Sequence, residues 1–181
     1  KWDANLKLEI NWKGSLEWFK NNDDNQNMLK KVAVIQGFGS EAEIISKEKA
    51  LGYEPNVLLN QNFITRSPRD GAINPVKAIK KMIQRIQSKG GRVIFPAEFL
   101  GLAANKEGVT AKTSHGLIRA DKIVYACGTG SNLVAQGKYL KPPTPGLIVT
   151  SKPFKQTINK ILVGPGVHVY QRRDGVVILG E

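Results

Sequence analysis

The first seventy residues alternate between short apolar runs and polar breaks. Alternating apolar positions predict a strand over residues 2–11, which continues after a glycine through residues 13–19. The polar run at residues 21–25 is typical of a helix start, and the helical spacing that follows predicts a helix ending on glycines near residue 37. A serine followed by acidic residues predicts a second, short helix that opens at residues 40–43.

The strongest pattern begins at Asn74. Asparagine is a favoured N-cap, and Pro75 suits the first position of a helix. Apolar residues then recur three and four positions apart, which predicts one buried stripe, and a Gly-Gly pair at residues 90–91 ends the helix. The stripe consists of Val76, Ile79, Ile83 and Ile86.

The rest of the chain has the pattern of strands. Short buried strands are predicted over residues 92–95 and 122–127. An antiparallel meander is predicted between them, with strands at residues 99–104, 108–113 and 116–120. The proline-rich residues 142–146 predict a linker or a sharp crossover. Four more strands are predicted at residues 147–150, 161–163, 167–171 and 176–179, the last two joined by a hairpin turn at Asp174–Gly175.

Composition narrows the class of protein. With 41% hydrophobic and 23% charged residues, the chain is expected to fold, and no apolar run approaches the roughly 20 residues that cross a bilayer. Cys127 is the only cysteine, so an internal disulfide is excluded and a reducing compartment is favoured. His115 and His168 lie far apart without cysteine partners, so no metal site is expected. Because the first residue is Lys1, we expect the chain to be cut from something longer.

The net charge of +12 raises the question of nucleic-acid binding. The basic residues at positions 77, 80, 81 and 85 share one helix with the apolar stripe, and the others are scattered, which favours a solvated helix face. No RNA-recognition, zinc-finger or GxxG signature with interleaved aromatics is present. Nucleic acid is therefore not the expected partner, although a non-enzymatic basic module that binds RNA or an acidic surface stays as an alternative.

One glycine motif has the form of a dinucleotide loop. The apolar residues 32–35 precede Gly37-Phe38-Gly39, as a strand precedes a GxGxxA turn. A dinucleotide fold also needs a following strand and an acidic residue about 20 positions on to hold the ribose, and neither is present. These glycines are therefore interpreted as a helix end rather than a phosphate-binding loop.

Several phrases resemble one known family when taken in order. They are Gly14-Ser15-Leu16, residues 43–55, residues 70–75, residues 91–93, residues 119–128 and residues 174–180. Their order and spacing resemble the D-amino-acid oxidase family, which also includes glycine oxidase, sarcosine oxidase and D-amino-acid dehydrogenase. The resemblance implies an α+β fold: a mixed, largely antiparallel sheet of a substrate domain, plus a partial FAD-binding α/β region.

The resemblance also implies a division of labour. Residues 1–69 and 141–181 would form the substrate domain, and residues 70–140 would be a segment of the FAD domain. By position, Phe99 would approach the adenine of FAD. Ala126, Cys127 and Gly128 would lie against the cofactor at the end of a strand, although a small buried cysteine is the alternative reading of Cys127.

Tyr170 falls where the family often places a tyrosine that faces the substrate. His168 and Arg172 share its strand face, because alternate residues of a strand point the same way. A phenol, an imidazole and a guanidinium on one face could bind the carboxylate of an amino acid. The alternative for this face is a solvated edge strand.

Departures from the family pattern limit what the chain can do alone. Gly130 stands where a Trp is usual, and Arg173 replaces a common Pro. The glycine fingerprint is absent, as is the C-terminal segment that usually supplies the carboxylate-binding arginine. The resemblance thus implies a fragment without FAD and without activity of its own. Its full-length parent would oxidise the C–N bond of a small amine or amino acid, such as a D-amino acid or glycine, by hydride transfer to flavin.

Two matters remain open in the sequence. Within the family, the chain could instead be the oxidoreductase part of an enzyme that modifies wobble uridine in tRNA. The expected location is cytoplasmic, with or without a peripheral attachment to the inner membrane. No residue is assigned as a catalytic acid or base, since the flavin carries the difficult chemistry.

Overall fold

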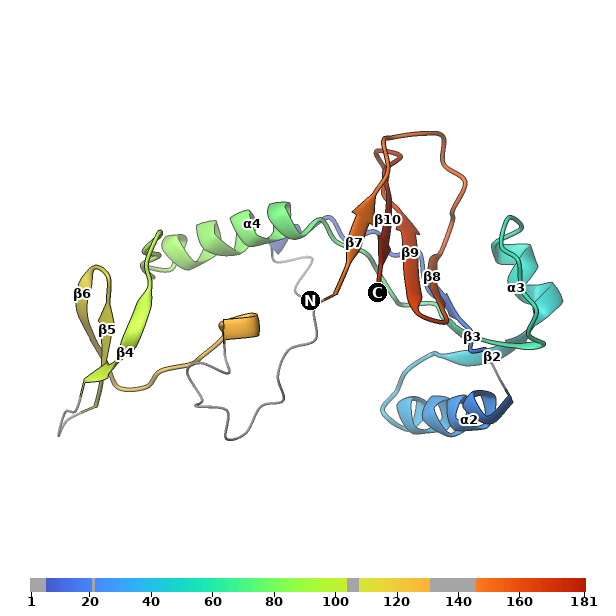
Figure 1. Ribbon diagram of the computed structural model, residues 1–181, viewed down its shortest axis with the longest axis horizontal. Helices are drawn as coiled ribbons and strands as arrows, with labels where there is room; N and C mark the ends of the chain where they lie inside the picture. The colour runs from blue at the N-terminus through green and yellow to red at the C-terminus, as the bar shows by residue number, and fades with distance from the viewer. Residues whose placement is uncertain (1–5, 21, 104–107, 131–145) are drawn as a thin grey trace. The chain divides into compact units, whose positions relative to one another are not determined.

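A computed structural model describes residues 6–20, 22–103, 108–130 and 146–181 (Figure 1). The chain divides into two compact units. The first combines residues 1–85 with residues 146–181, and the second is residues 86–145. The predicted linker lies outside the described residues except for Gly146.

The first unit is built on a seven-stranded sheet in the order β2-β3-β1-β8-β9-β10-β7. Every neighbouring pair is antiparallel except β1 and β8, which run parallel. The predicted α+β class with a largely antiparallel sheet is therefore confirmed. The strands are β1 (Ser15–Glu17), β2 (Glu43–Ser46), β3 (Phe63–Ser67), β7 (Ile148–Thr150), β8 (Ile161–Gly164), β9 (Val167–Gln171) and β10 (Val177–Gly180).

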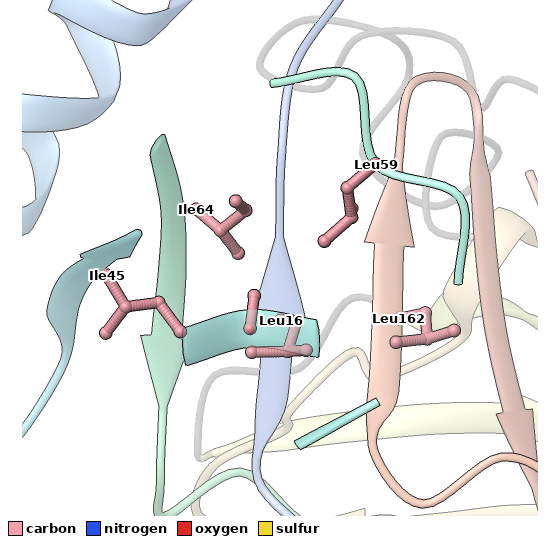
Figure 2. Packing of buried hydrophobic residues seen from close by; sticks show 6 residues of the cluster. Leu16, Ile45, Leu59, Ile64 and Leu162 are labelled. Atoms are coloured by element: carbon pink, nitrogen blue, oxygen red, sulfur yellow. The ribbon is translucent and has the colours of Figure 1, made fainter. Parts of the chain in front are cut away.

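Two helices cover opposite faces of one end of this sheet. Ile45 of β2 belongs to a core cluster with Ala50 of α3 (Lys47–Tyr53). Ile44, its neighbour in the strand, packs instead against the cluster formed by Met28 and Val32 of α2 (Asn22–Gly37). Because successive strand residues point to opposite faces, α2 and α3 lie on different sides of the sheet. Figure 2 shows the α3-side cluster, in which Leu16, Ile45, Leu59, Ile64 and Leu162 converge.

The sequence-based predictions for the first 46 residues are partly wrong. The helix α2 and its end at the glycines are confirmed, which also confirms that this glycine motif follows a helix and not a strand. Described residues 6–11 form no strand, because Lys7 and Glu9 have positive φ angles of 51° and 60°, which no strand contains. The helix predicted at residues 40–43 is absent. Glu43 begins β2 by pairing with β3, and the serine that caps the next helix is Ser46.

A fully buried amide, Gln171, holds the long connection before β8 against the sheet. Its Oε1 accepts hydrogen bonds from the backbone N–H groups of Thr157 and Ile158 at 2.8 and 3.1 Å. Its Nε2 donates to the carbonyls of Phe154, Lys155 and Gly175 at 3.3, 3.1 and 2.9 Å. Since these backbone groups belong to irregular chain, one buried side chain replaces the ladder that a strand would have supplied.

Helix α4 (Pro75–Ser88) confirms the strongest prediction of the sequence. Asn74 caps it, because its Oδ1 accepts a hydrogen bond from the N–H of Lys77 at 3.1 Å. The expected burial of its apolar stripe is wrong within this chain: Val76 and Ile79 are 60% and 53% exposed. The stripe has the helical period, but few apolar residues of the described chain pack on it.

The meander of the second unit forms as predicted. Strands β4 (Phe99–Ala103), β5 (Val109–Thr113) and β6 (Gly116–Ala120) pair in order and antiparallel. The two buried strands predicted on either side of it, residues 92–95 and 122–127, do not form. Phe95 and Val124 are 91% and 86% exposed. An apolar run becomes a strand only where a neighbour accepts its backbone hydrogen bonds, and the described residues offer these two runs none.

The predicted hairpin between β9 and β10 is confirmed and suggests a test. Gly175 lies in its turn with φ +86°, and a Cβ there would lie 2.3 Å from the carbonyl oxygen of Phe154. Gly166 has a similar φ of +71°, but nothing lies within 4 Å of the corresponding Cβ position. We expect Gly166→Ala to lower the free energy of unfolding by about 1–2 kcal/mol through backbone strain. Gly175→Ala should cost about 3 kcal/mol because steric overlap is added. Urea unfolding of both variants checks this, and equal losses would contradict it.

The amide of Gln171 should matter for stability far more than an exposed glutamine. We expect Gln171→Leu to lower the free energy of unfolding by about 3 kcal/mol or more, because five buried or part-buried backbone groups lose a hydrogen bond. The matched control is Gln84→Leu on the exposed surface of α4, which should change stability by less than about 0.5 kcal/mol. A shift of the urea midpoint that is the same in both variants would refute the role given to Gln171.

Candidate functional site

A pocket of about 200 Å³ lies in the first unit, where three segments meet. Residues 8–11, the start of α4, and the turn after β9 supply its walls. The backbone of Asn11 exchanges two hydrogen bonds with that of Ala72, at 2.8 and 3.0 Å, which fixes the first segment beside the second. The third wall is the hairpin whose inner side Gln171 holds. A concave site with a few convergent polar groups is the usual place for a small ligand.

The pocket is lined by charged side chains of both signs. Glu9 accepts hydrogen bonds from two ammonium groups. Its Oε2 lies 3.3 Å from Nζ of Lys77, and its Oε1 lies 3.1 Å from Nζ of Lys81. These hydrogen bonds from Lys81 and Lys77 hold the pKa of Glu9 below its ordinary value. On the opposite wall, Arg172 pairs with Asp174, and this contact lowers the pKa of Asp174. Both carboxylates are therefore already engaged by cations.

The structure brings together two of the three residues that the sequence predicted to bind substrate. Tyr170 and Arg172 are both half-buried and line the pocket. His168 is exposed, pairs in the sheet with Val163 and Gly180, and does not line it. Tyr170 and Arg172 are flanked by the buried Gln171, whose side chain lies on the other face of the strand.

Sequence reasoning missed the rest of the pocket. Glu9, Lys77 and Arg173 also line it, although the sequence pattern assigned Lys77 to a solvated helix face. Residues 9 and 77 are 68 positions apart, and no local pattern pairs them. The one sequence feature that pointed to this part of the pocket was Arg173, which replaces a proline that is common in the family.

The residues predicted to contact FAD lie in the second unit. Phe99 opens β4, and its ring meets that of Tyr125 edge to face at 5.6 Å between centroids. Ala126, Cys127 and Gly128 are exposed, so the alternative reading of Cys127 as a buried residue is wrong. The N–H of Gly130 donates to the carbonyl of Cys127 at 3.0 Å, which turns the chain into the short helix η1 (Gly128–Gly130).

These residues fit part of a flavin site. The exposed apolar segment that ends at Ala126 could lie against a ring, and a Cβ built at Gly128 meets no atom within 4 Å, so a ligand can come close to the backbone there. The group that a dinucleotide most needs, a glycine loop at a helix N-terminus for the pyrophosphate, is missing from the described residues. The described residues therefore fit a portion of such a site.

The described residues show neither a metal-binding cluster nor a membrane-spanning helix. Among the residues that the structure describes, His, Cys, Asp and Glu side chains form no group of three or more that could hold a metal ion. Over the same ranges, no helix combines the length and the apolarity needed to cross a bilayer.

The sheet, its flanking helices and its charged pocket define an α+β domain with a concave, polar surface. Residues 2–181 match the family model described as FAD dependent oxidoreductase (DAO). The chain belongs to this family of FAD-dependent oxidoreductases, and the predicted resemblance and the family's cofactor are confirmed.

The chain is also similar to individual enzymes in sequence or in fold. L-2-hydroxyglutarate dehydrogenase from Escherichia coli O17:K52:H18 is 27% identical over 158 residues, which cover 78% of this chain and 37% of the relative. L-proline dehydrogenase from P. horikoshii superposes with a TM-score of 0.86 at 20% identity, over 98% of this chain and 50% of that protein. Glycine oxidase from Geobacillus kaustophilus gives 0.82 at 15% identity, over 98% and 51%. The solved structures share the fold, and this chain spans about half of their length or less.

The lowered pKa of Glu9 leads to a prediction on pH. We expect its carboxyl group to titrate below the usual range, and Lys81→Met to move its pKa upward. Because the folded-state pKa is lowered, the stabilisation from this contact is present above the ordinary carboxyl pKa. It is lost as the pH falls through the folded-state pKa. Carboxyl ¹³C NMR titration measures the effect. Lys80→Met, a neighbour on α4 with no ion pair to Glu9, is the control, and an equal effect of both variants would contradict the assignment.

Proposed function

We propose that this chain is part of an FAD-dependent oxidoreductase that oxidises the C–N bond of a small amine or amino acid, for which a D-amino acid or glycine is the model substrate. Hydride transfer to the flavin is the reaction type. The observation that carries the proposal is the pocket at the end of β9, where Tyr170 and Arg172 meet in a chain of this family. A guanidinium and a phenol beside each other are suited to a carboxylate.

The two compact units support a division of roles. We assign residues 1–69 and 141–181 to a substrate domain and residues 70–140 to an FAD-domain segment. The compact unit that contains residues 1–69 extends to Arg85, so residues 70–85 pack with the proposed substrate domain although their sequence resembles the FAD-domain segment. In this assignment the first turn of α4 contributes to the substrate pocket, while Phe99 and residues 126–128 contribute to the cofactor site.

The chain's own residues would bind and orient the substrate. Arg172 would hold its carboxylate through two parallel N–H donors, and Asp174 would keep the guanidinium in place. The hydroxyl of Tyr170 would donate a further hydrogen bond. When bound, the flavin supplies the hydride acceptor, so no protein nucleophile is required.

A second candidate is the oxidation of a carbon that bears a hydroxyl group. The observation that favours it is the similarity to L-2-hydroxyglutarate dehydrogenase. Both reactions remove a hydride from a carbon next to a carboxylate, so the same pocket would serve either. The bond that is oxidised is decided by comparing amino acids with the matching 2-hydroxy acids as reductants of the flavin.

The proposal predicts a selective effect of Arg172. In the flavin-loaded enzyme, Arg172→Met should raise KM for a carboxylate substrate about 10- to 100-fold, which corresponds to the loss of one charged hydrogen-bonded contact. Tyr170→Phe should raise it less, because a neutral hydrogen bond is lost. Anaerobic reduction of the flavin, followed by absorbance, measures both.

Two further variants make this test specific. Lys30→Met removes a surface cation on α2 and should leave KM unchanged within about twofold. His168→Gln tests the sequence-based prediction that His168 also contacts the substrate. If Lys30→Met raised KM as much as Arg172→Met, the pocket would be ruled out as the substrate site.

A further inference from the structure

The charges around the pocket do not balance. Three cations line it, at Lys77, Arg172 and Arg173, and Lys81 adds a fourth through Glu9. The carboxylates that oppose them are Glu9 and Asp174. Four cations against two carboxylates leave an excess of two positive charges beside a concave surface.

The distribution of ion pairs shows where this excess lies. Glu9 is shared by two lysines, so one lysine charge is not neutralised. Asp174 is occupied by Arg172 and also accepts the N–H of Val176 at 3.3 Å. Among the ion pairs between described residues, none includes Arg173. The second positive charge of the excess is therefore that of Arg173.

The surroundings of Arg173 make this charge more effective. Lys13 lies near enough that the charge of Arg173 contributes, after burial, to lowering the pKa of the Lys13 ammonium. A cation among other cations attracts an anion more strongly than an isolated surface arginine does. Arg173 also follows Arg172 directly, so two guanidinium groups project from consecutive residues of one turn.

The size of the pocket limits the anion. Its volume of about 200 Å³ lies below the roughly 300–1,000 Å³ that is typical of sites for drug-sized ligands. A nucleotide or a peptide is too large to be enclosed. A short carbon chain with a charged group at each end suits both the volume and the two positive charges.

We propose that the pocket selects a short dicarboxylic acid, with one carboxylate bound by Arg172 and Tyr170 and the second by Arg173 and Lys77. This inference rests on the proposed function and specifies its substrate class: a dicarboxylic amino or hydroxy acid. Arg173 is then the residue that determines specificity, since it adds a second anion site to the one at Arg172.

Direct binding tests the inference without any turnover. Glutarate, a dianion, and butyrate, a monoanion of similar length, are titrated into the protein at low salt and followed by NMR. We expect glutarate to bind at least about tenfold more tightly, as one further charged contact provides. Arg173→Gln should remove most of this preference and leave butyrate binding unchanged, whereas Arg172→Gln should weaken both ligands.

A matched arginine controls for net charge. Arg119→Gln on the exposed strand β6 removes the same charge outside the pocket and should preserve the preference for glutarate. Equal affinity of the wild-type protein for the two acids would overturn the inference. So would a preference that survives Arg173→Gln or that Arg119→Gln removes to the same extent.

Turnover separates this inference from the proposed function. If neither amino nor hydroxy acids reduce the flavin of the loaded enzyme, the proposed function fails, while glutarate binding still reports on the pocket. If monocarboxylic and dicarboxylic substrates are oxidised with equal kcat/KM, the function stands and the dicarboxylate inference fails. A kcat/KM that favours dicarboxylates and loses this preference in Arg173→Gln supports both.

Discussion

The hydrogen bonds of the buried Gln171 amide are the interaction on which the rest of the first unit depends. Its amide makes hydrogen bonds to the backbone of Phe154, Lys155, Thr157, Ile158 and Gly175, and the bond to Gly175 is buried. A buried polar group of this kind destabilises the fold when it lacks a hydrogen-bond partner. When it is fully hydrogen-bonded, it favours one specific arrangement of the chain. The geometry leaves only one position for the irregular chain before β8, and it fixes the turn after β9. Because alternate strand residues face opposite sides, fixing Gln171 inward also fixes Tyr170 and Arg172 toward the pocket.

Two further side chains, the half-buried Lys13 and the buried Glu54, connect the same irregular segment to distant parts of the chain. Nζ of Lys13 donates to the carbonyls of Gln171 and Ile158 at 3.0 and 3.2 Å. Glu54, 1% exposed, accepts the N–H groups of Asn159 and Lys160 at 2.7 and 2.8 Å through one carboxylate oxygen. Burial lowers the pKa of Lys13, and the nearby charge of Glu54 acts in the opposite direction. Segments more than a hundred residues apart are thus joined by side chains that satisfy backbone groups, beside a small apolar core.

The two compact units differ in how complete they are. In the first unit, seven strands pair in one sheet, which carries an apolar core and the pocket. In the second, the meander pairs internally, yet the apolar runs on either side of it are exposed and unpaired within the described residues. This contrast agrees with the residues that could contact FAD, which offer surface for a ring but no phosphate-binding loop. It is also consistent with a chain that spans about half of its solved relatives.

The sequence by itself determined the elements whose signals are local. The cap at Asn74, the turn at Asp174–Gly175, the meander, and the glycines that end α2 are each set by residues within a few positions. The sequence also put Tyr170 and Arg172 on one strand face, and both line the pocket, while their contact with a substrate stays a prediction. Tertiary structure decided the rest. Residues 43–46 became a strand because β3 pairs with them, whereas residues 92–95 find no partner strand among the residues that the structure describes. The pocket joins Glu9, Lys77 and Arg173 across long separations in sequence, and such contacts depend on how the elements pack, which no local pattern encodes.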